Sequence, residues 1–236
     1  MGQAVYRGNV TAGGVSGVHY ITADLADVSV QSIPGSVYAS SYSGINGTFF
    51  SGSTLVGIAA KQGGVQVRDS GASNNYGLYS RSTLVSYNYG GSTCGVALLN
   101  AIKDFHYGLS SINWAIGGIG LYLSDTFSGT EAQQRQAYID KCVAVEHAQS
   151  VNSFENSAKI NRTAIGFNYS TKKVTMLYLK SGSAWDCRKV LKALGCDNGI
   201  LLDSGTSSQM KANTTKVNTK TNSVYSMVAV QPSSWA

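Results

Sequence analysis

The sequence predicts an α+β fold: a single domain with a mixed, mainly antiparallel β-sheet core and a few flanking helices. Its 236 residues suit one large domain. Charged residues make up only 13%, and 27 Gly beside 2 Pro are typical of many short strands joined by glycine-rich turns. Strand-like and helix-like segments do not alternate regularly, which disfavours a parallel sheet. We expect the domain over residues 15–236, preceded at 1–14 by a tail or a cloning remnant.

Alternating apolar residues and turn signals predict the strands. In the first strand Val18, Tyr20 and Thr22 share one face. We expect the strand at 28–33 to be its partner. Gly63-Gly64 predicts a hairpin. In chain order the expected strands are 15–25, 28–33, 43–45, 56–60, 65–68, 82–87, 114–116, 163–168, 174–179, 199–202 and 224–230.

Two capping boxes predict helices, because each pairs a Ser or Thr with an acidic or amide side chain three residues later. Thr130-Glu131-Ala132-Gln133 begins a helix toward Val145, and Ser183-Ala184-Trp185-Asp186 begins a second one. The second helix has apolar residues at helical spacing and a C-terminal glycine, which are Cys187, Val190, Leu191, Leu194 and Gly195. We also expect a short helix at 95–102.

Composition and charge narrow the possible partners. The net charge of +6 serves solubility or attracts an anionic ligand. No Lys/Arg cluster resembles a nucleic-acid arm, so we expect no nucleic-acid partner. No run of about 18 apolar residues exists, so we expect no membrane span. No basic region followed by an apolar run is visible at the N-terminus. The oligomeric state stays open.

The four cysteines, Cys94, Cys142, Cys187 and Cys196, do not follow a zinc spacing. Cys187 and Cys196 flank the second predicted helix, which would hold them too far apart for a disulfide. We expect buried free thiols. No His/Asp cluster has ligand spacing, so we expect no metal and no cofactor, while an oxygen-ligated cation stays open.

Three segments, 44–50, 115–120 and 200–208, share one format: an apolar strand runs into a polar turn that contains glycine. Such turns expose backbone N–H groups, and these bind anions. A fourth segment places Arg162 at the mouth of an apolar strand, where its planar guanidinium suits phosphate. Taken singly, each segment is more commonly an ordinary turn or a surface arginine.

Taken together and in this order, the four segments resemble the phosphodiester glycosidase family. The family pattern is an Asn-Gly-Gly-Phe-Phe loop, an Ile-Gly-Gly segment, an Arg-Thr-Ala-Ile-Gly strand and a Leu-Asp-Gly-Gly-Gly-Ser-Ser turn. Residues 46–50, 115–118, 162–166 and 202–208 match it, and the likeness extends over roughly 15–231. The chain departs from the pattern in the turns, where Thr48, Ser204 and Thr206 replace Gly, and at Asn222-Ser223, where the family often has Arg.

The resemblance implies a hydrolase that cuts the anomeric carbon–oxygen bond of a sugar-1-phosphodiester. It implies catalytic roles for Asp203, Arg162 and Asn46: Asp203 as base or cation stabiliser, Arg162 as phosphate ligand, and Asn46 as the residue that orients sugar or water. The implied substrate-binding residues are Gly47, Thr48, Gly117, Gly118, Ser204, Gly205, Thr206, Ser207 and Ser208. The partner would be a sugar phosphate, a nucleotide sugar or a glycan.

Other interpretations stay open. Asp203 also fits an Asx turn that caps its own loop, and Glu155 is a second carboxylate more typical of an exposed loop. The altered turn would allow a binding module for a phosphorylated glycan or nucleotide, such as a phage adhesion part or a ligand sponge. A structural protein with a residual pocket is a third hypothesis.

Two glycosylation sequons, 46–48 and 161–163, lie inside the predicted site, where a glycan would block it. We therefore expect a bacterial or phage origin, with the bacterial cytoplasm or a phage-associated location favoured.

Overall fold

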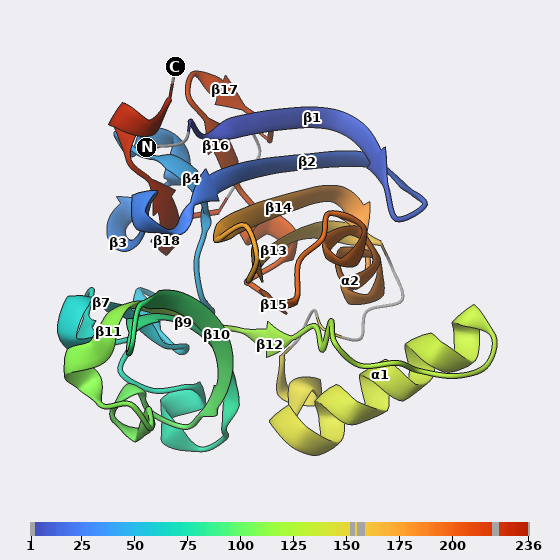
Figure 1. The fold of residues 1–236 in the computed structure, drawn as a ribbon, viewed down its shortest axis with the longest axis horizontal. Coiled ribbons are helices and arrows are strands. Elements are labelled where there is room, and N and C mark those ends of the chain that lie inside the picture. Colours follow the sequence, from blue (N-terminus) through green and yellow to red (C-terminus); the bar gives the residue numbers. More distant parts are fainter. Residues whose placement is uncertain (1–2, 152–153, 155–158, 219–221, 236) are drawn as a thin grey trace.

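The computed structural model describes residues 3–151, 154, 159–218 and 222–235. It confirms the α+β class, with three larger antiparallel sheets and two α-helices among these residues (Figure 1). A two-stranded hairpin joins β5 (Phe50–Ser51) and β6 (Thr54–Leu55). Short 3-10 turns occupy Leu25–Asp27, Val37–Ala39, Gln62–Gly64, Asn75–Gly77, Ile102–Asp104, Leu109–Ser111, Ala148–Ser150, Gly205–Ser207 and Pro232–Ser234.

The six-stranded sheet has the order β1-β2-β14-β13-β15-β12. Its long central hairpin, β13 with β14, was predicted from the turn near residue 171, and the register runs from Phe167 opposite Val174 to Arg162 opposite Leu179. The strand bounds are β1 Val5–Ala12, β2 Val15–Asp24, β12 Ile119–Gly120, β13 Ile160–Asn168, β14 Lys173–Gly182 and β15 Asn198–Leu201.

The second sheet has the order β17-β16-β4-β18-β3 and lies beside the first in Figure 1. Its strands are β3 Val28–Gly35, β4 Ser43–Asn46, β16 Met210–Ala212, β17 Thr215–Lys216 and β18 Val224–Val230. The third sheet, β10-β9-β11-β7-β8, lies at the lower left of the figure. Its strands are β7 Ala59–Lys61, β8 Val65–Gln66, β9 Arg81–Asn88, β10 Ser92–Leu99 and β11 Ile112–Gly117.

Both predicted capping boxes are present. The Thr130 side chain accepts from Gln133 N at the start of α1 (Glu131–Glu146), and Gln133 Oε1 accepts in return from Thr130 N at 2.8 Å. Ser183 and Asp186 exchange the same pair of bonds at the start of α2 (Ala184–Ala193). These reciprocal bonds satisfy N–H groups that a helix start leaves unpaired. Neither helix is long and apolar enough to cross a membrane.

The structure corrects three predictions. Residues 95–102 do not form a helix, because Ser92–Leu99 pairs residue by residue with β9; a short apolar run cannot be told from a helix by periodicity alone. β3 pairs with β18 rather than with β2, because the turn at Leu25–Asp27 directs the chain into another sheet. The expected N-terminal tail contains β1, which forms a hairpin with β2 across Gly13 and Gly14, both at positive φ.

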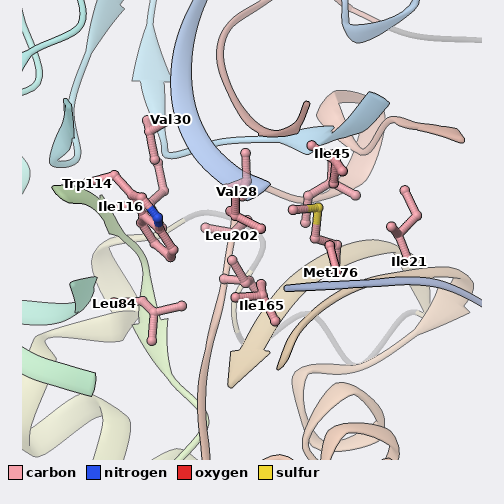
Figure 2. Close-up of a cluster of buried hydrophobic side chains, with 14 of the residues drawn as sticks. Ile21, Val28, Val30, Ile45, Leu84, Trp114, Ile116, Ile165, Met176 and Leu202 are labelled. Atoms are coloured by element: carbon pink, nitrogen blue, oxygen red, sulfur yellow. The ribbon is translucent and has the colours of Figure 1, made fainter. Parts of the chain in front are cut away.

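One cluster of buried side chains joins the three sheets (Figure 2). Ile21 and Met176 come from the six-stranded sheet, Ile45 from the second sheet, and Leu84 and Trp114 from the third. Burial of such side chains is the main stabilising term. All four cysteines are buried and free, as predicted.

Candidate functional site

Two of the predicted loops meet at β13. Asn46 is the last residue of β4, and Asp203 follows the end of β15. Asn46 Nδ2 donates to the Asp203 carbonyl oxygen at 2.9 Å. The Thr163 hydroxyl, on β13, donates toward Asn46 Oδ1 at 3.0 Å and the same Asp203 carbonyl at 2.8 Å. These bonds bring together residues more than a hundred positions apart along the chain.

The Asn46 side chain is held rigidly. It is 1% exposed, and its Oδ1 also accepts from Gln209 N at 3.0 Å. Gln209 is fully buried, and its own Oε1 accepts from Val37 N and Ser36 Oγ. Sequence reasoning missed Gln209, because nothing local marks a glutamine whose partners lie in distant loops. Asn46 therefore acts as a bridge between loops, whatever it does toward a ligand.

We expect Asn46→Ala to lower the free energy of unfolding by about 2–4 kcal/mol, because the change leaves the buried Gln209 N–H without its acceptor and removes the tie to Asp203. Denaturant unfolding measures the difference. The control is Asn88→Ala at the exposed end of β9, which should change stability little. Equal stability of the two variants would show that the bridge does not hold the loops.

The Asp203 carboxyl group sits in a setting that favours proton exchange. Its Oδ1 accepts from Ser204 N at 2.9 Å, and the Ser207 side chain also hydrogen-bonds to the carboxyl. Burial raises the pKa of Asp203 to about 6, and the bonds from Ser207 and Ser204 offset this only in part. A carboxyl with a pKa this close to neutrality can act as a general base or acid near pH 7.

The 204–208 turn is tightly built. Gly205 has φ of 71°, a left-handed conformation that glycine adopts most readily. Ser204 Oγ donates to the Leu202 carbonyl at 3.1 Å. Thr206 Oγ1 accepts from Asn222 Nδ2 at 2.7 Å, and Asn222 N donates to the Thr206 carbonyl. Thr206 and Asn222 are two of the positions that depart from the family pattern, and they bond to each other.

Serine hydroxyls line the same turn. Ser207 is 7% exposed and Ser208 is fully buried. Ser208 Oγ has no hydrogen-bond partner among the residues that the structure describes. An unpaired buried hydroxyl calls for a physical explanation, and a bound polar group is one.

Arg162 precedes Thr163 on β13, so the two side chains point to opposite faces of the sheet. Arg162 is completely buried and donates from Nε to the Gly182 carbonyl at 3.1 Å. Burial lowers the pKa of the guanidinium, and Cys187, Tyr138 and Asp186 act against that shift.

The strand register fixes the face on which Arg162 lies but ends before Asp203. Ala164 pairs with Leu201, and the Leu202 N–H bonds to the Thr163 carbonyl at 2.9 Å. β15 ends at Leu201, and the Asp203 N–H bonds instead to the Gly47 carbonyl at 3.3 Å. Ala164 and Leu201 belong to the same buried cluster, and side chains alternate along a strand. The register therefore places Arg162 on the face of Ala164 and Leu201, whereas the groups that shift the pKa of Asp203 besides burial are Ser207 and Ser204.

The remaining predicted glycines are packed against protein. A Cβ on Gly117 would lie 2.3 Å from Asn74 Oδ1, and one on Gly118 would lie 2.2 Å from the Leu201 carbonyl oxygen. A Cβ on Gly47 would meet Ser226 Oγ at 2.4 Å. Thr48 N donates to that same Ser226 Oγ. Close backbone packing thus requires these glycines, independently of any ligand.

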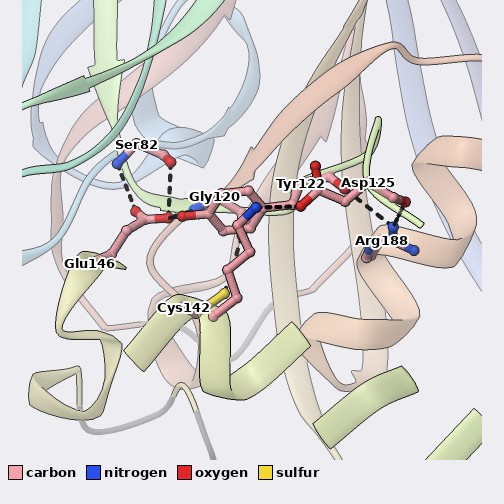
Figure 3. Close-up of polar contacts among 8 residues, drawn as sticks. Ser82, Gly120, Tyr122, Asp125, Cys142, Glu146 and Arg188 are labelled. Atoms are coloured by element: carbon pink, nitrogen blue, oxygen red, sulfur yellow. Dashed lines mark hydrogen bonds and ion pairs between the residues drawn. The ribbon is translucent and has the colours of Figure 1, made fainter. Parts of the chain in front are cut away.

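A buried carboxylate that the sequence analysis did not single out anchors the segment after Gly118 (Figure 3). Glu146, the last residue of α1, is fully buried. Its oxygens accept from Ser82 N at 2.7 Å, Ser82 Oγ at 3.0 Å, Gly120 N at 2.9 Å and Tyr122 Oη at 2.6 Å. Burial raises the pKa of Glu146, and these four bonds oppose the shift. An acidic residue at a helix C-terminus is unfavourable beside the helix dipole, so its presence there was the sequence signal that could have identified Glu146.

No group of three or more His, Cys, Asp or Glu residues is placed to hold a metal ion within the described part of the chain. Glu155, the possible second carboxylate, lies outside the described residues.

No family model and no curated protein matches the chain. Solved structures share its fold. The catalytic domain of zebrafish N-acetylglucosamine-1-phosphodiester alpha-N-acetylglucosaminidase, auto-inhibited by its pro-peptide, superposes with a TM-score of 0.63 and 16% identity, covering 97% of this chain and 82% of that one. A Burkholderia pseudomallei protein predicted to be exported gives 0.60 and 12%, covering 91% and 74%. A hypothetical Synechocystis protein gives 0.55 and 12%, covering 97% and 62%. At these identities the likeness is one of fold.

Proposed function

We propose that this protein is a hydrolase that cleaves the anomeric carbon–oxygen bond of a sugar-1-phosphodiester and releases the sugar and a phosphomonoester. The junction of Asn46, Thr163 and Asp203 carries the proposal, because its bonds to the Asp203 carbonyl hold in place a residue whose carboxyl group has a pKa of about 6. The fold likeness to a phosphodiester glycosidase supports the same class of reaction.

In this proposal water attacks the anomeric carbon as the bond to the phosphate oxygen breaks, and the bonding electrons leave with the phosphate. The transition state resembles an oxocarbenium ion. The ionised Asp203 carboxylate stabilises that positive charge and takes a proton from the attacking water, which it later returns to solvent. A phosphomonoester is a good leaving group, so protonation of the leaving oxygen matters less than for an ordinary glycoside.

Arg162 and the backbone N–H groups of the 204–207 turn would hold the phosphate. A guanidinium that burial has stripped of water gains most from an anionic ligand. The Ser207 and Ser208 hydroxyls add donors, and Asn46 keeps the Asp203 loop in place through its bond to the Asp203 carbonyl. The Thr206–Asn222 bonds support the turn at two positions where the family pattern has other residues.

The experiment is hydrolysis of a panel of sugar-1-phosphodiesters that includes UDP-N-acetylglucosamine, with both products identified. We expect free sugar together with a phosphomonoester. Asp203→Ala should lower kcat at least about a hundredfold, the usual contribution of a positioned acid–base group. A matched control is Asp197→Ala, an exposed carboxylate after α2, which should retain activity.

The outcomes separate the proposal from its rival. If nothing is hydrolysed but a sugar phosphate binds saturably and binding is lost in Arg162→Lys, the chain is a binding module that uses the same residues. If neither turnover nor binding appears, only the fold is shared.

A further inference from the structure

An uncharged cavity is lined by none of the residues of the Asp203 turn. Its volume is about 340 Å³, and it lies between the turn at Leu25–Asp27, the start of β3, and strands β9, β10 and β11. Neutral hydrogen-bonding side chains dominate the lining: Ser29, Gln62, Ser86, Ser92, Asn113 and Trp114. Leu25 and Val28 add an apolar side, and none of the described residues that line it is charged.

Trp114 provides the first sign of a ligand. Its side chain is 3% exposed, and it forms part of the buried cluster shown in Figure 2. Its Nε1 has no hydrogen-bond partner among the residues that the structure describes. Buried indole N–H groups normally find an acceptor, so an unpaired one on a residue that lines a polar cavity points to an acceptor on a ligand.

The strand geometry provides the second sign. On β11, Ile112 pairs with Tyr87 and Trp114 pairs with Ser86, so Asn113 is an extra residue in a β-bulge. Bulges often re-aim side chains beside functional sites. Here the bulge lets the neighbouring residues Asn113 and Trp114 both line the cavity, where a regular strand would direct them to opposite faces. Asn113 Nδ2 lies 3.4 Å from Ser86 Oγ, a weak bond that a better acceptor can replace.

From this lining we infer that the cavity is a binding site for a neutral sugar unit. Hydroxyl and amide groups can each donate and accept, which suits the many hydroxyls of a pyranose, and the apolar side suits its C–H face. A phosphate or carboxylate would find no cation to pair with among the described lining residues. The site is independent of the proposed hydrolysis, so either idea can fail without the other.

Indole NMR tests this inference directly. The chain has three tryptophans, so a 15N spectrum shows three side-chain N–H resonances, which Trp→Phe variants assign. Titration with N-acetylglucosamine, mannose and glucose methyl glycosides should shift the Trp114 resonance saturably for at least one sugar. Trp235 serves as the internal control, because its Nε1 also lacks a partner among the described residues but lies outside this cavity.

Two variants test the cavity itself. Asn113→Ala and Ser29→Ala, both half-buried, should each weaken sugar binding about tenfold, the effect of losing one good hydrogen bond. Their unchanged far-ultraviolet circular dichroism would establish that they fold. Three results would overturn the inference. No sugar moves the Trp114 resonance, adenosine moves it instead, or both variants bind the sugar as tightly as the wild type does. Sugar binding without any hydrolysis would support this site and leave the proposed reaction unsupported.

Discussion

Asp203→Asn is expected to give an inactive protein that is more stable than the wild type at neutral pH. Burial raises the pKa of Asp203 from its ordinary 3.8 to about 6, so the folded state holds this proton more tightly than the unfolded state. As pH rises from 3.8 through 6, the free energy of unfolding falls, because the unfolded chain ionises first. The whole penalty is then present above pH 6 and amounts to about 3 kcal/mol at most.

Asparagine cannot ionise, so it removes this loss of stability while it keeps the size and shape of the side chain. Its Oδ1 can still accept from Ser204 N, and its amide can donate to the Ser207 hydroxyl. Denaturant unfolding at several pH values measures the effect: the variant should exceed the wild type most above pH 6 and match it below 3.8. Asp140→Asn, an exposed carboxyl on α1, is the matched control and should follow the wild type. A destabilised Asp203→Asn at pH 7 would contradict the assigned cause.

The same titration governs the rate. If the ionised carboxylate is the base, kcat/KM should rise with pH through about 6 and then level. A rate that falls over this range would assign Asp203 the role of acid. Stability lost to an ionised buried group that catalysis needs is a common trade-off at functional sites.

How far the sequence predicted the fold depended on the distance between interacting residues. The capping boxes at Thr130 and Ser183 use partners three residues away, and both were predicted correctly. The β10 strand was mistaken for a helix because its pairing with β9 is absent from its local pattern. The position of β3 in a different sheet from β2 likewise depends on its pairing with β18, about 200 residues later.

The site follows the same rule. The loops that carry Asn46 and Asp203 are recognisable as motifs, whereas Gln209, Asn222 and Glu146 have roles set by contacts between separate elements. The hydrogen bond between Thr206 and Asn222 is visible only in the structure, because the two residues are 16 positions apart in the sequence. A motif therefore identifies candidate residues within a loop, but not the residues elsewhere in the chain that hold the loop in place.

Glu146→Ala is expected to destabilise the fold at least as strongly as Asn46→Ala. It leaves the Ser82 N–H, Gly120 N–H and Tyr122 hydroxyl without their acceptor in a buried setting. Each buried donor left unpaired costs about 1–3 kcal/mol, so the free energy of unfolding should fall by about 4 kcal/mol after partial rehydration. For a chain of this length that corresponds to about 10 °C in Tm, measured by calorimetry.

Glu146→Gln keeps the size and shape of the side chain but replaces one acceptor oxygen with an NH2 donor. Both oxygens accept from a backbone N–H, Ser82 N at Oε2 and Gly120 N at Oε1, so the amide nitrogen of glutamine must face one of them. Hydroxyl donors can rotate away, but these backbone donors cannot, and we expect a loss of about 1–3 kcal/mol. Glu131→Gln, at the exposed start of α1, is the control and should change Tm little.

The loss of stability should be greatest near Glu146 rather than uniform over the fold. Gly120 follows Gly118, whose backbone packs against Leu201, two residues before Asp203. Loss of the Glu146 anchor should therefore accelerate hydrogen exchange at the Gly120 and Ser82 amides in Glu146→Gln more than at β14, in the centre of the six-stranded sheet. Uniform acceleration would mean that Glu146 contributes only to overall stability. Acceleration confined to these amides, with kcat reduced and KM unchanged, would identify Glu146 as a residue that positions the strand next to the Asp203 loop.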